Sequence, residues 1–178
     1  MFRSLTVILI VSLSVGCAQT LQEQAKTAAD FDVIELTISD AQAAIRSNII
    51  RCEQLTERYL KRIETFDKTT GLNAITYVNP NALPKARQLD RAFAKSDSMK
   101  KLHCIPIILK DNFDTADMPT EAGSVALRGS HPPDDAFMVK RLREEDAIII
   151  AKSNMGEWAF SPHRTISSTH GETRNAYD

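Results

Sequence analysis

The chain has 178 residues, the length of one domain or of a piece of a larger one. Its hydrophobic content of 43% and charged content of 25% are those of an ordinary globular protein. With a formal net charge of −1, nothing in the overall charge argues for nucleic acid or an anionic membrane surface as a partner, and neither is expected.

Residues 1–17 are predicted to be an export signal. Arg3 precedes an apolar stretch from Leu5 to Val15, which is too short to span a bilayer and has the length of a signal-peptide core. Ser14 to Cys17 resembles a lipoprotein processing site, with Cys17 as the lipid anchor. Cleavage after Ala18 by an ordinary signal peptidase is the alternative. We favour the lipoprotein and expect an exported protein of the cell envelope, membrane-bound only through this signal or anchor.

Residues 18–37 are predicted to be a tether, because Leu21 to Asp30 is polar and short of large apolar side chains, with a loose helix as the alternative for that stretch. Apolar residues at helical spacing then predict several helices. A capping box from Ser39 to Gln42 marks the first, which carries Ile45 and Ile49 on its apolar face. The others are expected at residues 53–66, at 82–94 with Asn81 as cap, and from an Asp134 or Asp135 cap to 145, with short helices near 125–128 and 154–159.

Three short runs of β-forming residues predict strands at Ala74–Val78, Ile105–Leu109 and Ala147–Ala151. Strands that alternate with helices indicate a layered α/β fold with a largely parallel sheet. Pro106 should lie at the beginning of its strand or on an edge strand. Residues 161–178 are polar and show no clear period.

Cys52 and Cys104 remain when the signal is removed. No CxxC motif occurs, so no zinc site is expected. Cys52 opens a helix and Cys104 opens an apolar strand, which favours two unpaired, partly buried thiols. A disulfide between them is the alternative, since exported proteins form disulfides.

Two lysines follow apolar strands directly, Lys110 and Lys152. The carboxyl end of a parallel strand is where α/β folds place ligands, and a partly desolvated lysine there can act as a base. Spacing alone does not separate the two, and each can equally mark the point where a strand leaves the core. Asp111, Asp114 and Asp117 lack the calcium-loop pattern and are expected to form turns in a solvated loop.

The stretch LHCIPIILKDNFDTADMPTEAGSVAL (102–127) resembles the hallmark segment of the amidase signature family. The likeness extends from about Ile38 to the closing GETRNAYD. It implies a layered α/β/α fold with a mixed, largely parallel central sheet, of which residues 38–178 form the N-terminal part and therefore an incomplete sheet. Cys104, Asp146 and Ala151 stand where the family usually has glycine.

The resemblance also implies a Ser–cis-Ser–Lys hydrolase that cleaves carboxylic amide C–N bonds other than peptide bonds, without metal or organic cofactor. The lysine of its K-D-N motif is the base, which here is Lys110. The family's bridging and nucleophilic serines lie in a Gly/Ser-rich segment after the T-R-N-x-Y-D element, here Thr173 to Asp178. Ser167 and Ser168 precede that element, so neither receives a triad role.

Three functions follow from this resemblance. The first is an exported amidase acting on a small-molecule or peptide amide, for which residues 1–178 alone would be inactive. The second is a catalytically dead relative that serves as an envelope lipoprotein or binding module. The third is an amidotransferase subunit that modifies tRNA-bound glutamate, which shares the K-D-N segment; the predicted export signal argues against it.

Overall fold

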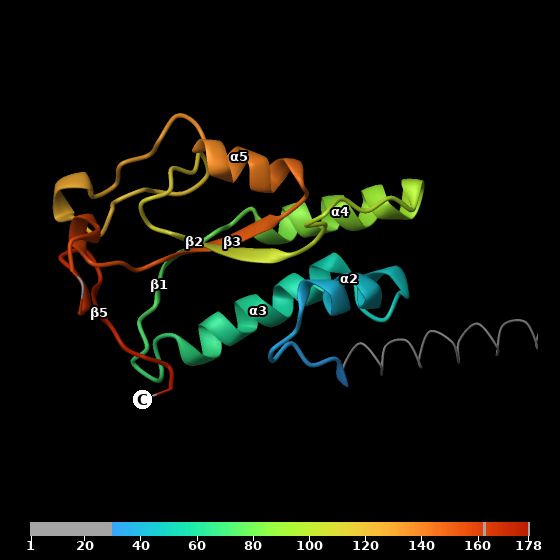
Figure 1. Cartoon of the computed structure of the whole chain (residues 1–178), viewed down its shortest axis with the longest axis horizontal. Helices are drawn as coiled ribbons and strands as arrows, with labels where there is room; N and C mark the ends of the chain where they lie inside the picture. The colour runs from blue at the N-terminus through green and yellow to red at the C-terminus, as the bar shows by residue number, and fades with distance from the viewer. Residues whose placement is uncertain (1–29, 162, 178) are drawn as a thin grey trace, which may run out of the picture. The chain divides into compact units, whose positions relative to one another are not determined.

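A computed structural model describes residues 30–161 and 163–177 (Figure 1). The predicted signal, the lipid-anchor candidate Cys17 and residues 18–29 of the predicted tether lie outside the described residues. The chain divides into two compact units between Arg51 and Cys52. Within the described ranges, no helix has the length and apolar character needed to cross a bilayer.

The first unit holds α2 (Ile38–Arg46). Its N-cap is Thr37, whose hydroxyl accepts a hydrogen bond from the Asp40 amide at 3.1 Å and donates to the Asp40 carboxylate at 2.6 Å. The predicted cap at Ser39 is therefore wrong by two residues. The Thr37 hydroxyl, not that of Ser39, accepts the hydrogen bond from a free amide of the first turn. The helix ends at Arg46, so Ile49 lies beyond it and is 40% exposed.

The second unit is built on a three-stranded mixed sheet in the order β1-β3-β2. The strands are β1 (Ile75–Val78), β2 (Pro106–Lys110) and β3 (Ile148–Ser153). The two outer strands flank β3, antiparallel for β1 and parallel for β2. The three predicted strands and the mixed α/β sheet are confirmed. Pro106 is the first residue of an outer strand, where its missing N–H is tolerated.

Helices cover this sheet on both faces (Figure 1). On one face, α3 (Cys52–Phe66) and α4 (Ala82–Ser96) pack together and against β3. On the other lies α5 (Phe137–Glu144), whose Val139 is buried in a cluster with Leu109, Met118 and Ile149. Side chains alternate along a strand, so Ile148 and Ile150 turn toward α3 and α4. All three isoleucines are buried, as expected for a strand covered on both faces.

The predicted beginning of the helix is confirmed for α4, which ends at Ser96 rather than near residue 94, and is wrong for α5. Asn81 is the residue before α4, and Pro84 is its third residue, where no amide hydrogen is required. For α5 the N-cap is Ala136, without a side-chain cap. Asp135 instead accepts from the Ala116 amide at 2.9 Å and pairs with Arg143. The Asp135 carboxylate, which the sequence assigned to the helix N-cap, therefore binds Ala116 and Arg143 instead.

Cys52 and Cys104 form a disulfide, so the prediction of two unpaired thiols is wrong. Cys52 begins α3 and Cys104 precedes β2, and their Cα atoms lie 5.2 Å apart. This separation lies in the range that a disulfide requires. Both residues are fully buried. The bridge therefore joins a helix to the start of the strand that ends at Lys110.

The segment after Ser161 contains a β-hairpin that its sequence did not indicate. It consists of β4 (Thr165–Ser167) and β5 (Gly171–Thr173), paired antiparallel. Two side chains of the second unit bind it. Asn73 donates to the carbonyls of His170 and Glu172, and Asn154 donates to the Gly171 carbonyl at 3.0 Å. Tertiary contacts rather than a local hydrophobic pattern define these short strands.

Candidate functional site

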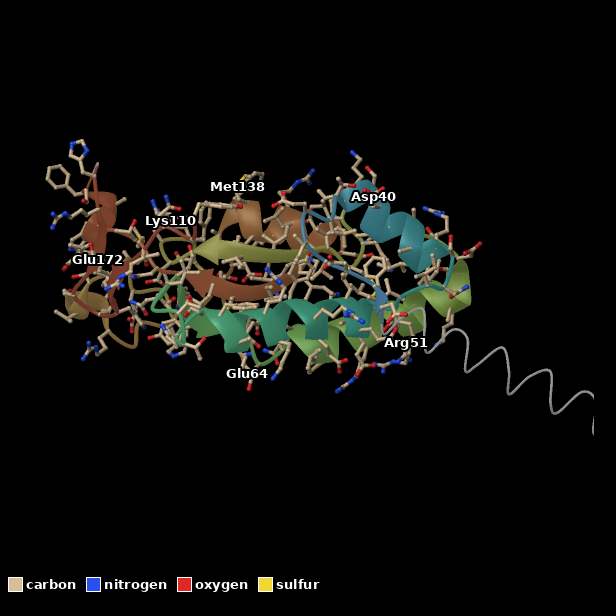
Figure 2. All side chains as sticks on the ribbon, turned by 90° about the horizontal axis from the view of Figure 1, so that it is seen from below. Asp40, Arg51, Glu64, Lys110, Met138 and Glu172 are labelled. Carbon is tan, nitrogen blue, oxygen red and sulfur yellow. A yellow bond between two sulfur atoms is a disulfide. The ribbon has the colours of Figure 1, made fainter. Side chains whose placement is uncertain are left out.

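Lys110 is the last residue of β2 and its side chain is exposed (Figure 2). It pairs with Ser153, the last residue of β3. The Asp111 amide still donates to the Ser153 carbonyl at 3.1 Å, and the Phe113 amide then donates to the Lys110 carbonyl at 3.0 Å. The chain therefore turns away directly after Lys110, which leaves the lysine at the carboxyl edge of the parallel pair, as predicted.

Lys152 has the same place after an apolar run but a different environment. Its side chain is fully buried. Its ammonium donates to the Phe113 carbonyl at 2.7 Å, the Pro119 carbonyl at 3.2 Å and the Thr120 hydroxyl at 2.9 Å. An ammonium has three donors, and these acceptors use all of them. Lys152 is thus buried inside the second unit, whereas Lys110 is exposed to solvent and accessible to a reactant.

Asp111 lies beside Lys152 and is fully buried, so its predicted place in a solvated loop is wrong. One carboxylate oxygen is 3.7 Å from the Lys152 ammonium, and the other accepts from the Gly123 amide at 3.3 Å. Burial raises the pKa of the Asp111 carboxyl, against the opposite effects of the Gly123 amide and Lys152. Burial likewise lowers the pKa of Lys152, and the Asp111 charge opposes that shift.

A second buried carboxylate fixes the far part of the same loop. Glu121 accepts from the Tyr77 hydroxyl at 2.7 Å and from the Gly129 amide at 2.8 Å. Burial and the Glu121 carboxylate together raise the pKa of Tyr77 to about 12. Neither residue is predictable from the sequence, because a lone Tyr on a strand and a lone Glu in a loop carry no local signal.

Gly123 and Ser124 pack tightly at the end of this loop. Gly123 has φ of +71°, and a Cβ there would lie 3.1 Å from both the Met155 carbonyl oxygen and the Ser167 Cβ. The Ser124 hydroxyl donates to the Glu157 carboxylate at 2.6 Å. This contact and one with Ser168 lower the pKa of Glu157. Gly123 and Ser124 are therefore small for structural reasons, close packing for the glycine and a hydrogen bond for the serine.

The hydroxyls of Ser167 and Ser168 form hydrogen bonds with backbone groups. Ser167 Oγ accepts from the His170 amide at 2.9 Å, and Ser168 Oγ accepts from the Val125 amide at 3.0 Å. Both hydroxyls thus satisfy backbone groups. In the part of the chain that the structure describes, no hydrogen bond joins either serine to Lys110.

One further cluster of chemically reactive groups surrounds the disulfide. His103 Nε2 lies 3.8 Å from Cys52 Sγ, and its Nδ1 lies 3.4 Å from the Asp146 carboxylate. The ligand atoms of Cys52, His103 and Cys104 all lie within 4.8 Å of one another, a spacing that a metal ion could use. Here the two sulfur atoms are bonded to each other, so the cluster is a disulfide with a neighbouring imidazole.

Comparison with known proteins decides the family. A sequence model described as Amidase matches residues 54–178. The chain belongs to the amidase family. The predicted amidase-signature membership and α/β fold are thereby confirmed, and the match includes both Lys110 and Lys152. The role of Lys110 remains a prediction.

Solved amidases share the fold. The chain resembles native peptide amidase from Stenotrophomonas maltophilia, with a TM-score of 0.77 and 39% identity over 81% of this chain and 30% of that chain. An amidase family protein from Bacillus anthracis gives a TM-score of 0.77 and 34% identity over 89% and 32% of the two chains. Among curated relatives, a glutamyl-tRNA(Gln) amidotransferase subunit of Streptomyces coelicolor is 37% identical over 83% of this chain and 29% of its own length. This amidase chain thus spans about a third of the relatives that it matches.

Proposed function

We propose that this chain supplies the lysine base of an amidase that hydrolyses carboxylic amide C–N bonds other than peptide bonds. The observation that carries the proposal is the position of Lys110. It stands exposed at the carboxyl end of β2, within the family match, while the competing Lys152 is buried and fully hydrogen-bonded. Access to a reactant is the first requirement for a base.

In the proposed reaction, Lys110 accepts a proton from the nucleophilic serine through a bridging serine. The serine oxygen attacks the amide carbonyl, the amine or ammonia leaves with a proton, and water hydrolyses the acyl-enzyme to the carboxylic acid. Backbone N–H groups stabilise the oxyanion. The resemblance assigns both serines to a segment after Thr173–Asp178, so residues 1–178 provide the base but not the nucleophile.

We propose a small-molecule amide or a peptide amide as substrate. The similarity to a peptide amidase supports an amide of this class. The test is release of ammonia from a panel of aliphatic, aromatic and C-terminal peptide amides by the complete polypeptide that the gene encodes. Hydrolysis that a serine-directed fluorophosphonate abolishes is expected. Failure on every amide, or hydrolysis insensitive to this reagent, would contradict the proposal.

A second candidate is an amidotransferase subunit, since relatives such as that of Streptomyces coelicolor bear this name. The predicted export signal opposes it. The two candidates differ in the fate of the released ammonia. Ammonia that appears free in solution, at a rate unchanged by added glutamyl-tRNA, supports the hydrolase. Transfer of the nitrogen to glutamyl-tRNA would support the amidotransferase.

We further propose that the protein is exported and held at the cell envelope by a lipid on Cys17. The apolar stretch before Cys17 and the small residue Gly16 support this proposal. Labelling cells with a radioactive fatty acid tests it: wild type should incorporate label in the membrane fraction and Cys17→Ser should not. Equal labelling of both proteins, or location of the wild type in the cytoplasm, would contradict it.

A further inference from the structure

We propose that Lys152 is a positioning residue for Lys110. Its buried ammonium holds the loop of residues 111–123 in the conformation that fixes the catalytic lysine at the end of β2. This inference rests on the proposed function, because it assigns Lys152 a role in the reaction that Lys110 is proposed to serve. Lys152 does not itself contact a reactant, since it is sealed from solvent.

The Lys152 ammonium cross-links two parts of the loop. It donates to the Phe113 carbonyl near the beginning of the loop and to Pro119 and Thr120 near its end. The Thr120 hydroxyl donates in turn to the Phe113 carbonyl at 3.2 Å. The two loop segments are thereby joined through one cation and one hydroxyl, in place of a regular strand or helix.

This network connects directly to Lys110. The Phe113 carbonyl binds Lys152, and the amide of the same residue donates to the Lys110 carbonyl at 3.0 Å. Asp111, which follows Lys110, has its carboxylate 3.7 Å from the Lys152 ammonium. The Asp111 carbonyl also accepts from the Ala122 amide at 3.2 Å. Two of the three residues that directly follow Lys110, Asp111 and Phe113, therefore contact the Lys152 ammonium.

The charge of Lys152 explains why an apolar side chain would not serve here. The residues before it in β3, from Ile148 to Ala151, are all buried and apolar, yet this position holds a cation. A methionine would leave the Asp111 carboxylate buried without its counter-charge and would remove three donors from the loop. An uncompensated buried charge and unsatisfied acceptors favour rearrangement of the loop.

The test compares Lys152→Met and Thr120→Val in the complete polypeptide, with Thr120→Ser as conservative variant and Lys140→Met as control on the exposed face of α5. We expect kcat to fall roughly 10- to 100-fold in Lys152→Met and Thr120→Val, because misplacement of a catalytic group by about 1 Å has such an effect. KM should change less than about two-fold, since binding is spared. Thr120→Ser keeps the hydroxyl and should retain most of the wild-type kcat, and the kcat of Lys140→Met should match wild type.

Hydrogen exchange supplies a readout independent of activity. Peptides covering residues 111–123 should exchange at least about ten-fold faster in Lys152→Met and Thr120→Val, while peptides in α3 keep their protection. Wild-type kcat together with wild-type exchange in either variant would overturn the inference. If Lys152→Met does not fold, Thr120→Val decides by the same criteria.

Comparison with Lys110→Ala also separates the positioning role of Lys152 from the proposed function. Full activity in Lys110→Ala would remove the proposed base and with it the reaction role of Lys152. Loss of activity in Lys110→Ala, combined with unchanged kcat and exchange in Lys152→Met, would overturn only the positioning role. Loss of activity in both, with faster exchange of 111–123 only in Lys152→Met, is the expected result.

Discussion

The Cys104 amide donates a hydrogen bond to the Asp146 carbonyl at 3.1 Å, and both residues have positive φ, +64° and +65°. They stand at two of the three positions where the amidase resemblance would place glycines. The left-handed conformation is costly for residues with a Cβ. Here each side chain has a partner, a disulfide for Cys104 and His103 with Lys100 for Asp146. The glycine geometry is thus retained without glycine.

We predict that glycine is preferred at position 104 once the disulfide is absent. In a Cys52→Ala background, Cys104→Gly should be about 1 kcal/mol more stable to unfolding than Cys104→Ala, because alanine keeps the φ strain. Paired thermal melts of the complete polypeptide measure the difference. Equal or lower stability of the glycine variant would show that position 104 carries no strain.

The disulfide should contribute substantially to stability. It closes a loop with a sequence separation of 52 residues. The chain-entropy relation gives roughly 4 kcal/mol for a loop of this length. We expect Cys52→Ser to lower the free energy of unfolding by about this amount and to abolish the effect of a reducing agent on the melt.

A thiol count checks the disulfide itself. The segment of residues 19–178 contains only Cys52 and Cys104. Denatured without reductant, it should show no free thiol, and after reduction it should show both. Two free thiols before reduction would restore the interpretation of unpaired cysteines.

Gly123→Ala should be more damaging than Gly129→Ala, although both glycines have nearly the same φ, +71° and +73°. Each substitution carries the backbone cost, about 1 kcal/mol. A Cβ at 123 also meets the Met155 carbonyl, whereas a Cβ at 129 has no heavy atom within 4 Å. The packing conflict should add about 1–3 kcal/mol. Equal melting temperatures of the two variants would contradict the packing of Gly123.

Tyr77 makes the stability depend on pH in the alkaline range. Its pKa is raised to about 12 in the folded protein, against about 10 when unfolded. The unfolded state therefore loses this proton first. The stabilisation from Tyr77 is fully present below pH 10 and is lost as the pH rises from about 10 to about 12.

Tyr77→Phe should therefore flatten the alkaline fall in melting temperature. Tyr177→Phe, which removes a side chain that is 92% exposed, is the matched control and should leave the fall unchanged. Melting curves recorded between pH 8 and 12 measure both. A fall as steep in Tyr77→Phe as in wild type would show that Tyr77 does not cause it.

The segment 19–178 should lack a sharp melt when purified alone. Several large apolar side chains of the second unit are exposed, among them Phe137 (75%), Trp158 (56%) and Phe160 (92%). Such surfaces promote association. Aggregation and absence of amide hydrolysis are the expected results. A monomer with a cooperative transition would favour the non-catalytic envelope protein.

The sequence predicted the parts of the fold that depend on local pattern. The apolar run ending at Lys110 is β2, and the consecutive isoleucines form β3, because burial on both faces requires continuous apolar residues. Pro84 determined the beginning of α4, since proline is tolerated only in the first turn. These inferences need only neighbours in the chain.

Contacts distant in sequence could not be predicted in the same way. Thr37 and Ser39 both have a hydroxyl that suits an N-cap. Thr37 caps α2 because the backbone leaves the helix there, which the sequence does not show. The distinction between Lys110 and Lys152 required the loop 111–123, which buries one lysine and leaves the other exposed. The pairing of Cys52 with Cys104 required the packing of α3 against β2.

The most direct measurement of the central claim is amide hydrolysis by the complete polypeptide carrying Lys110→Ala, with Lys140→Ala as the matched surface control. Lys110 is exposed, so its truncation should leave the melting temperature unchanged. We predict a loss of kcat of at least about 10²-fold, the scale of general base catalysis, and wild-type kcat in Lys140→Ala. A folded Lys110→Ala protein with wild-type kcat would contradict the assignment of Lys110 as the base.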